Sequence, residues 1–247
     1  MFNTTPILSA LITTLILASC GGGGGGGSSS TPAPAPTAAV TVPLLTAIAN
    51  STNNSSSKSF TVSGYYSTTN NTLTGSGTRN VSAATSAVIS GVSYLKQSSV
   101  TTGTATALNA TVLNLNTSGI SYANPSTYAT VIVDDTNPYV VINPYTYPAT
   151  VTTGDAGQFA TGITYSNSSK TTVTGSVTQN YQVLANTSTS VLVKVITNIY
   201  NTSSVQTLQS ITTSTIDTSG AITPVKLEQY SYSVGGSTPY YIVETYQ

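Results

Sequence analysis

Apolar and polar residues alternate through most of the chain after the first forty positions. Val81 to Leu95 shows this alternation, and so does the run Val191 to Ile196, and both are bounded by clusters of Asn, Ser, Thr and Gly. A period of two places alternate side chains on opposite faces of a strand, and the clusters supply turn residues. We therefore predict an all-β, antiparallel fold.

Two stretches of about one hundred residues match each other in order and spacing, which indicates an internal duplication. The matching pairs are Phe60 to Ser67 with Phe159 to Ser166, Thr74 to Thr78 with Thr174 to Thr178, Asn116 to Ile120 with Asp217 to Ala221, and Thr136 to Val141 with Ser237 to Ile242. We predict repeat A over residues 41–148 and repeat B over 149–247, each with about five or six strands.

Turn and helix signals divide the repeats further. Candidate hairpin turns, where Gly or Asn takes positive φ at low cost, are Thr68 to Asn71, Thr117 to Gly119, Asn167 to Ser169 and Thr218 to Gly220. Pro144 to Pro148 lacks backbone donors, so it belongs on an edge or in a connection and marks the repeat boundary. One short helix is predicted from Pro43 to Ala49, with Asn50 as its stop.

The two repeats can pack as one curved sheet or barrel-like body, or stand as tandem sandwiches. We favour one joint body, because a sheet edge must be blunted and only 5% of the residues are charged. A membrane-spanning barrel would need outward strands more apolar than these Thr-rich ones.

Composition adds a balanced charge and a high tyrosine content to this picture. Six basic and six acidic residues are scattered singly, while Tyr occurs 16 times. The β-branched and aromatic content favours a folded chain over a disordered one. Without a basic stripe to neutralise phosphates, we expect no nucleic-acid partner.

The first twenty residues carry the most specific motif. Ile7 to Leu17 is an apolar run of signal-peptide length, and it ends in Leu17-Ala18-Ser19-Cys20. This sequence resembles the lipobox of bacterial lipoproteins, which implies a signal peptide over residues 1–19 and acylation of Cys20. Met1 to Pro6 departs from the usual signal by having no Lys or Arg, which puts export efficiency in doubt.

Residues 20–40 read as a tether. Gly21 to Gly27 and Ser28 to Ser30 form a flexible coil, and Thr31 to Pro36 a stiffer polyproline-like spacer. The Cys-Gly-repeat-Ser segment resembles that of β-rich outer-membrane lipoproteins of Gram-negative bacteria. Gly21 after the cysteine implies sorting to the outer membrane. The resemblance transfers no functional residue beyond Cys20.

The sequence offers few candidates for catalytic or metal-binding residues. The chain has no His and its one Cys is assigned to lipid, so Ser-His-Asp, Cys-His and ordinary zinc sites are excluded. We expect no catalytic residue, metal or cofactor. Asp217-Thr218-Ser219-Gly220 is similar to an aspartic-protease loop, but the repeat has Asn116 where that mechanism needs a second carboxylate, so a turn with an Asx cap is favoured.

The other acidic residues are also explained by local structure. Asp134 and Asp135 could begin a calcium site, yet the matching residues are Gly235-Gly236, which favours a turn. Glu228 and Glu244 are the best pair for a glycosidase, but both lie in alternating strand sequence. Asp155 fits a turn into repeat B.

Tyrosines are the remaining candidates. Tyr145, Tyr147, Tyr240 and Tyr241 are the weak binding-surface candidates, although a chain with three Phe and no Trp also needs Tyr to fill its core. We expect a non-enzymatic, membrane-anchored envelope lipoprotein that binds an envelope protein or an apolar ligand between its halves. A surface adhesin or coat component is the alternative, and a hydrolase with paired carboxylates ranks third.

Overall fold

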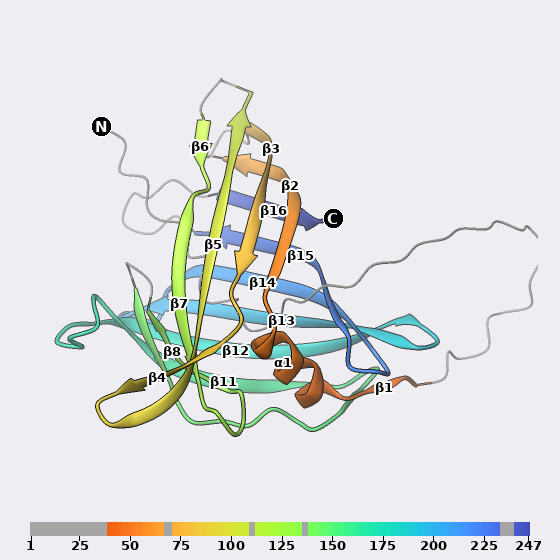
Figure 1. Ribbon diagram of the computed structural model, residues 1–247. Coiled ribbons are helices and arrows are strands. Elements are labelled where there is room, and N and C mark those ends of the chain that lie inside the picture. Colours follow the sequence, from red (N-terminus) through yellow and green to blue (C-terminus); the bar gives the residue numbers. More distant parts are fainter. Residues whose placement is uncertain (1–38, 67–70, 109–111, 135–137, 233–239) are drawn as a thin grey trace, which may run out of the picture.

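The last strand of the chain pairs with the first long strand of the body, and this pairing closes the sheet into a barrel (Figure 1). The computed structural model describes residues 39–66, 71–108, 112–134, 138–232 and 240–247. β16 (Tyr240–Tyr246) runs antiparallel to β2 (Ser56–Tyr66), with Tyr240 opposite Tyr66 and Tyr246 opposite Phe60. The result is a closed, twelve-stranded antiparallel barrel. The predicted all-β class and the single joint body are confirmed.

The wall strands follow one another around the ring in chain order. Between β2 and β16 they are β3 (Asn71–Val81), β5 (Val92–Ala107), β7 (Thr117–Ala123), β8 (Thr130–Asp134), β9 (Tyr139–Ile142), β11 (Ala156–Tyr165), β12 (Val173–Thr187), β13 (Ser190–Asn201), β14 (Gln206–Asp217) and β15 (Ile222–Ser231). Outside the ring, β4 (Thr85–Ile89) and β6 (Val112–Asn114) each pair with β5, and β1 (Thr41–Val42) pairs with β10 (Val151–Thr152).

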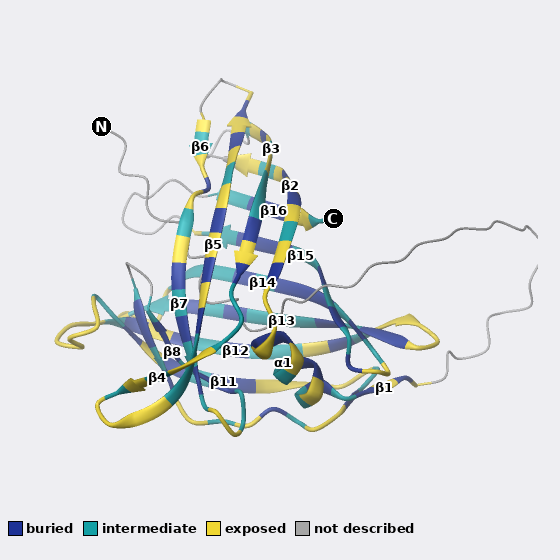
Figure 2. Ribbon diagram, in the orientation of Figure 1, coloured by how far each residue is buried: buried dark blue, intermediate teal, exposed yellow. Residues whose placement is uncertain are grey.

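Side chains alternate between the inside and the outside of the wall. In β5, Gln97, Ser99 and Thr101 are buried, whereas Ser98 and Val100 are exposed. Figure 2 shows this alternation as bands of buried and exposed residues along the strands. Because the period is two, a shift of one residue moves a side chain from the interior to the outer wall.

Gly77 leaves room for the buried ring of Phe60 where β2, β3 and β5 lie side by side. Phe60 is 1% exposed, and its Cζ atom lies 2.5 Å from the place where a Cβ at Gly77 would be. Leu73 and Ala105 pack in the same cluster as Phe60. Phe60 therefore fills this part of the interior, packed over Gly77 and beside Leu73 and Ala105.

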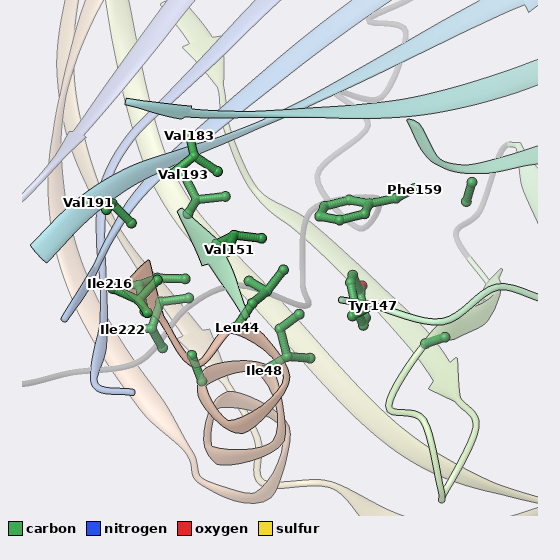
Figure 3. Close-up of a cluster of buried hydrophobic side chains, with 14 of the residues drawn as sticks. Leu44, Ile48, Tyr147, Val151, Phe159, Val183, Val191, Val193, Ile216 and Ile222 are labelled. Atoms are coloured by element: carbon green, nitrogen blue, oxygen red, sulfur yellow. The ribbon is translucent and has the colours of Figure 1, made fainter. Parts of the chain in front are cut away.

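Helix α1 (Leu44–Asn53) fills one end of the barrel (Figure 3). Leu44 and Ile48 are fully buried, and they belong to one cluster with Val191, Ile216 and Ile222 from the wall. The helix begins after Pro43, which suits a helix start because its φ is already fixed near the helical value.

The helix runs four residues beyond the predicted end at Ala49. The Thr52 hydroxyl donates to the Ile48 carbonyl at 2.9 Å, within the extra turn. Gln97 Nε2 of β5 donates to the Ser51 and Thr52 carbonyls, each at 3.4 Å. The Thr52 carbonyl also accepts the Ala84 amide at 2.9 Å. The end of the helix is thus held by residues distant in sequence, which local capping signals could not indicate.

Most turn predictions lie at turns, and one is wrong. Residues 167–169 and 218–220 connect neighbouring strands, and Pro144 to Pro148 lies in the connection from β9 to β10. Thr117 to Gly119 instead begins β7, where Gly119 pairs with Ser99 of β5. Residues 68–70 lie outside the described residues. Gly119 is therefore a buried residue within a strand and not part of a turn.

The N-terminal side of the body enters at the α1 end. Thr41 and Val42 pair with Thr152 and Val151, and the Leu45 amide donates to the Ala149 carbonyl at 3.3 Å. Cys20 and the tether lie outside the described residues. Over the part of the chain that the structure covers, no helix has the length and apolar character needed to cross a membrane.

Replacing Leu44 with Ala is expected to lower the free energy of unfolding by about 2–5 kcal/mol, because the side chain is 0% exposed and its loss leaves a cavity under the barrel end. Urea unfolding followed by circular dichroism measures the change. Thr46→Ala on the exposed face of α1 is the matched control, with an expected change under about 0.5 kcal/mol. Equal losses in the two variants would contradict the packing role of α1.

Candidate functional site

Three tyrosines stand in register on the outer wall. Tyr241 of β16 lies opposite Tyr230 of β15 on one side and Tyr65 of β2 on the other. The Tyr230 and Tyr241 rings stack with centroids 4.4 Å apart, and the Tyr65 ring lies 5.5 Å from that of Tyr241. Tyr65 is 38% exposed. We call these three residues the tyrosine row.

A charged pair occupies the adjoining positions of the same outer face. The Tyr241 hydroxyl donates to Glu228 Oε1 at 3.1 Å, and Lys226 Nζ lies 3.0 Å from Glu228 Oε2. Each residue is two positions along β15 from the next, so Lys226, Glu228 and Tyr230 share one face. Partial burial, with hydrogen bonds to Tyr230 and Glu228, raises the pKa of Tyr241 well above its usual value, so its hydroxyl stays a donor.

Amide side chains continue the tyrosine row along the next strands. Gln209 of β14 lies opposite Tyr230, and Asn198 of β13 lies opposite Gln209. Gln209 Nε2 donates to Asn198 Oδ1 at 2.9 Å, which fixes both amides. The outer face thus presents an ordered band of amides and stacked rings, with the Glu228 carboxylate, 9% exposed, held beneath the rings.

The tyrosine row lies far from the end filled by α1. Gln209 is eight residues along β14 from Asp217, which borders the turn packed near Pro43 of the α1 start. Eight residues of strand span roughly 26 Å. The row is therefore presented toward the opposite end of the barrel from the point where the N-terminal segment enters.

Of the four tyrosines predicted as a surface, the structure places only Tyr241 in this row. Tyr147 is 7% exposed, and its hydroxyl accepts a hydrogen bond from the partly buried Tyr145 at 2.8 Å inside the barrel (Figure 3). Tyr240 points inward beside Ile242, and burial raises its pKa to about 12. The prediction for Tyr145, Tyr147 and Tyr240 as surface residues is wrong, because their rings pack against the buried clusters of the barrel interior.

Sequence reasoning missed Tyr65 and Tyr230. Both lie in runs with neighbouring aromatic or polar residues, so the sequence does not say which side chains face outward. The register between β15, β16 and β2 decides it, since it aligns these two residues with Tyr241. A signal would have required pairing β2 with the end of the chain, which is a tertiary contact.

The two best acidic candidates point to opposite sides of the wall. Glu228 lies opposite Val243, one position away from Glu244, so its side chain is on the outer face and that of Glu244 on the inner face. A two-carboxylate hydrolase needs both groups to face one cleft. Glu228 and Glu244 do not meet this requirement.

Glu244 belongs to a buried charged group inside the barrel. It is 3% exposed and accepts a hydrogen bond from the Tyr246 hydroxyl at 2.9 Å, while Arg79 of β3 is 1% exposed. Burial raises the pKa of Glu244, and the positive charge of Arg79 opposes that rise. Burial also raises the pKa of Tyr246 well above its usual value. These three side chains form a polar centre within the wall, shielded from solvent.

The remaining acids serve local structure. Asp217 Oδ1 accepts hydrogen bonds from the Ser219 and Ala221 amides and from the Ser219 hydroxyl, and these bonds lower its pKa. Asp155 Oδ2 accepts the Thr152 amide at 2.7 Å. The predicted Asx-capped turn at Asp217 is confirmed. Asp134 ends β8, and Asp135 lies outside the described residues.

No group of three or more His, Cys, Asp or Glu residues that could hold a metal ion occurs within the described ranges. Among the acidic residues in those ranges, Asp155 and Asp217 serve turns, Glu228 lies on the outer side of the wall and Glu244 in the interior. The side chains of the outer wall are best suited to binding a partner through the tyrosine row.

Replacing Arg79 with Met is expected to lower the free energy of unfolding by roughly 3 kcal/mol at pH 7, because it leaves Glu244 buried without the charge that favours its ionised form. A buried acid with a raised pKa keeps its proton when the unfolded chain has released it. Its contribution therefore falls as pH rises from the ordinary value of 4.5 through the raised one.

The decrease in the free energy of unfolding with rising pH should extend to higher pH in Arg79→Met. It should disappear when Glu244→Gln is added to Arg79→Met. Urea midpoints at a series of pH values for the three chains measure it. Parallel profiles for the wild type and Arg79→Met would show that Arg79 does not stabilise the Glu244 carboxylate.

Comparisons with protein-family models, with curated proteins and with solved structures find no match to this chain. The candidate site therefore rests on its own geometry: a row of three tyrosines in register, fixed amides on one side and a carboxylate in hydrogen-bond contact beneath it.

Proposed function

We propose that this protein is a lipid-anchored adhesin of the bacterial envelope, which binds neutral glycan chains through the tyrosine row and performs no catalysis. The observation that carries the proposal is the outer-wall band in which Tyr65, Tyr230 and Tyr241 adjoin Glu228 and Gln209. The anchor part of the proposal rests on the resemblance of Leu17 to Cys20 to a lipobox.

The chemistry of the band suits a sugar. Tyr rings offer apolar faces with a hydroxyl at one end, which matches the mixed apolar and polar surface of a pyranose. The amides of Gln209 and Asn198 both donate and accept hydrogen bonds. The buried Glu228 carboxylate holds the Tyr241 hydroxyl in place beside them. Rings already stacked on one another lose little side-chain entropy on binding.

Charge favours a neutral glycan over other partners. The chain carries six basic and six acidic residues, and the acid of the band is already paired with Lys226. Neither an anionic nor a cationic polymer gains from such a surface. A hydroxyl-rich neutral chain needs only hydrogen bonds and ring contacts, which the band provides.

The position of the band fits attachment to something beyond the membrane. The proposed tether joins at the α1 end, and the tyrosine row lies roughly 26 Å along the wall from that end. A flexible Gly-rich tether with a Pro-rich spacer would hold the body clear of the lipid. The row would then face outward into the surroundings.

Two other functions are less well supported. An apolar ligand between the halves would need an enclosed apolar cavity. A hollow of about 450 Å³ among the described residues, beside Ser57 and Asn80, opens to solvent and is lined mostly by serine, so it does not meet this need. A hydrolase with paired carboxylates would need Glu228 and Glu244 on one side of the wall.

Binding is tested with full-length protein in detergent micelles and a panel of neutral polysaccharides that includes dextran, mannan and galactan. Tyr241→Ala is expected to raise the dissociation constant about tenfold or more, because it removes the central ring of the row. Tyr122→Ala is the matched control, since the Tyr122 ring contacts the Tyr94 ring on another part of the outer wall, where Tyr122 lies opposite Lys96.

Near-ultraviolet circular dichroism checks that both variants stay folded. If the wild type binds none of the polysaccharides, or if Tyr122→Ala weakens binding as much as Tyr241→Ala, the glycan proposal fails.

The anchor is tested separately by Cys20→Ser. This change removes the sulfur that would carry the lipid, so the protein should move from the membrane fraction to the soluble fraction and lose labelling by radioactive palmitate. Ser19→Ala, which keeps a small residue before the cysteine, is the control and should stay membrane-bound. Unchanged fractionation of Cys20→Ser would remove the anchor while leaving the glycan proposal to its own test.

A further inference from the structure

β4 keeps a free edge outside the closed ring of the barrel. β4 pairs with β5 on one side, from Thr85 opposite Lys96 to Ile89 opposite Val92, and ends the strand order on the other. Figure 1 shows the β4–β5 hairpin projecting beyond the barrel near the α1 end. Proteins usually protect such an edge with charges, prolines or bulges. β4 has the sequence Thr-Ser-Ala-Val-Ile and contains none of these.

The turn of the hairpin determines which backbone groups face the free edge. Ser90 and Gly91 have φ values of 49° and 82°, as a two-residue type I′ turn requires. The flanking pair Ile89 and Val92 then exchange both hydrogen bonds, and the pattern alternates along the ladder. The backbone groups of Ser86 and Val88 therefore point away from β5.

A neighbouring contact supports this assignment. The Ala84 amide, two residues before Ser86, donates to the Thr52 carbonyl at 2.9 Å and so points away from β5 as well. Ser86 is exposed, and Val88 is 69% exposed. The free edge thus presents two N–H and two C=O groups beside an exposed apolar side chain.

We propose that β4 pairs antiparallel with β4 of a second copy of this chain, about a twofold axis at Ala87. In this register Ser86 exchanges two hydrogen bonds with Val88 of the other copy, and Val88 exchanges two with the other Ser86. All four free edge groups of each strand are then satisfied. A twofold interface uses the same patch on both copies, which this register does.

Side chains and charge suit a second copy. The two Ala87 side chains meet as the closest pair, and alanine is small enough for that approach. Val88 covers Ser86 of the other copy without a clash of like charges. Residues 81–95 carry no charge, and Lys96 lies on β5 opposite Thr85, not on the free edge. A charged peptide partner would find no complement at this edge, whereas a neutral copy does.

The size of the contact sets the expected strength. A stable interface usually engages about 20–30 residues on each side, and β4 offers five. We therefore expect a weak dimer in dilute solution that forms readily when copies are concentrated on one membrane. The pairing itself does not depend on the glycan proposal, because the tyrosine row lies near the other end of the barrel.

Disulfide trapping tests the register with the full chain in its membrane. Ala87→Cys should give a disulfide-linked dimer on mild oxidation, because two cysteines in a closest pair lie within the Cα separation that a disulfide spans. Ser93→Cys, exposed on the β5 strand of the same hairpin, is the matched control and should give at least about tenfold less dimer. The wild-type chain gives the background from Cys20.

Val88→Pro, placed on the Ala87→Cys chain, removes an edge donor that β5 does not use, so the hairpin can persist while the dimer is lost. Sedimentation of the detergent-solubilised chain should show a dimer dissociation constant raised at least about tenfold by Val88→Pro, with an unchanged thermal melt. Equal trapping by Ala87→Cys and Ser93→Cys overturns the proposal. The proposal is also overturned if the disulfide forms with a different protein, or if the hairpin is buried in lipid and no dimer forms.

Discussion

The pairing of β2 with β16 is the contact on which the rest of this structure depends. It joins Phe60 to Tyr246 and Tyr66 to Tyr240, at positions separated by nearly the whole body of the chain. Without it the sheet would have two long edges, each a row of unpaired backbone groups. With only 5% charged residues, the chain has little else with which to protect such edges. Closing the barrel therefore removes the two long edges along which this Thr-rich, neutral sheet would otherwise pair with other chains.

Closure also creates an interior that must be filled. At one end α1 supplies Leu44 and Ile48, and elsewhere a large ring such as Phe60 packs over Gly77. The same closure encloses Glu244 with Arg79, where water is excluded and each charge depends on the other. The interior is thus partly apolar and partly charged. Glu244, in the charged part, lies on β16, the strand that closes the ring by pairing with β2.

The tyrosine row is a second product of the closing contact. Tyr65 comes from β2, whereas Tyr230 and Tyr241 come from β15 and β16, so the row exists only after the ends of the barrel meet. A binding surface built in this way is coupled to folding. Any chain in which the ring opens would lose the row as well as the core. The free edge of β4, by contrast, lies outside the ring and is independent of closure.

The sequence by itself determined the class of the fold. Alternating apolar residues and turn clusters predicted antiparallel strands, the scarcity of charge favoured one joint body, and Pro43 indicated the helix start. These features are local, or follow from composition. It did not determine the helix end, because Gln97 reaches the Ser51 and Thr52 carbonyls from a distant strand. It also misplaced Thr117 to Gly119, since in the sequence a glycine buried within a strand looks the same as a glycine in a turn.

The candidate site was decided by tertiary structure. Tyr240 and Tyr241 are adjacent and chemically identical, yet one points into the barrel and the other into the row. Glu228 and Glu244 likewise fall on opposite faces, although the sequence offers them as a pair. A period of two means that facing is set by the register with neighbouring strands. That register depends on which strands meet when the barrel closes, so the sequence alone could supply these side chains but not assign their sides.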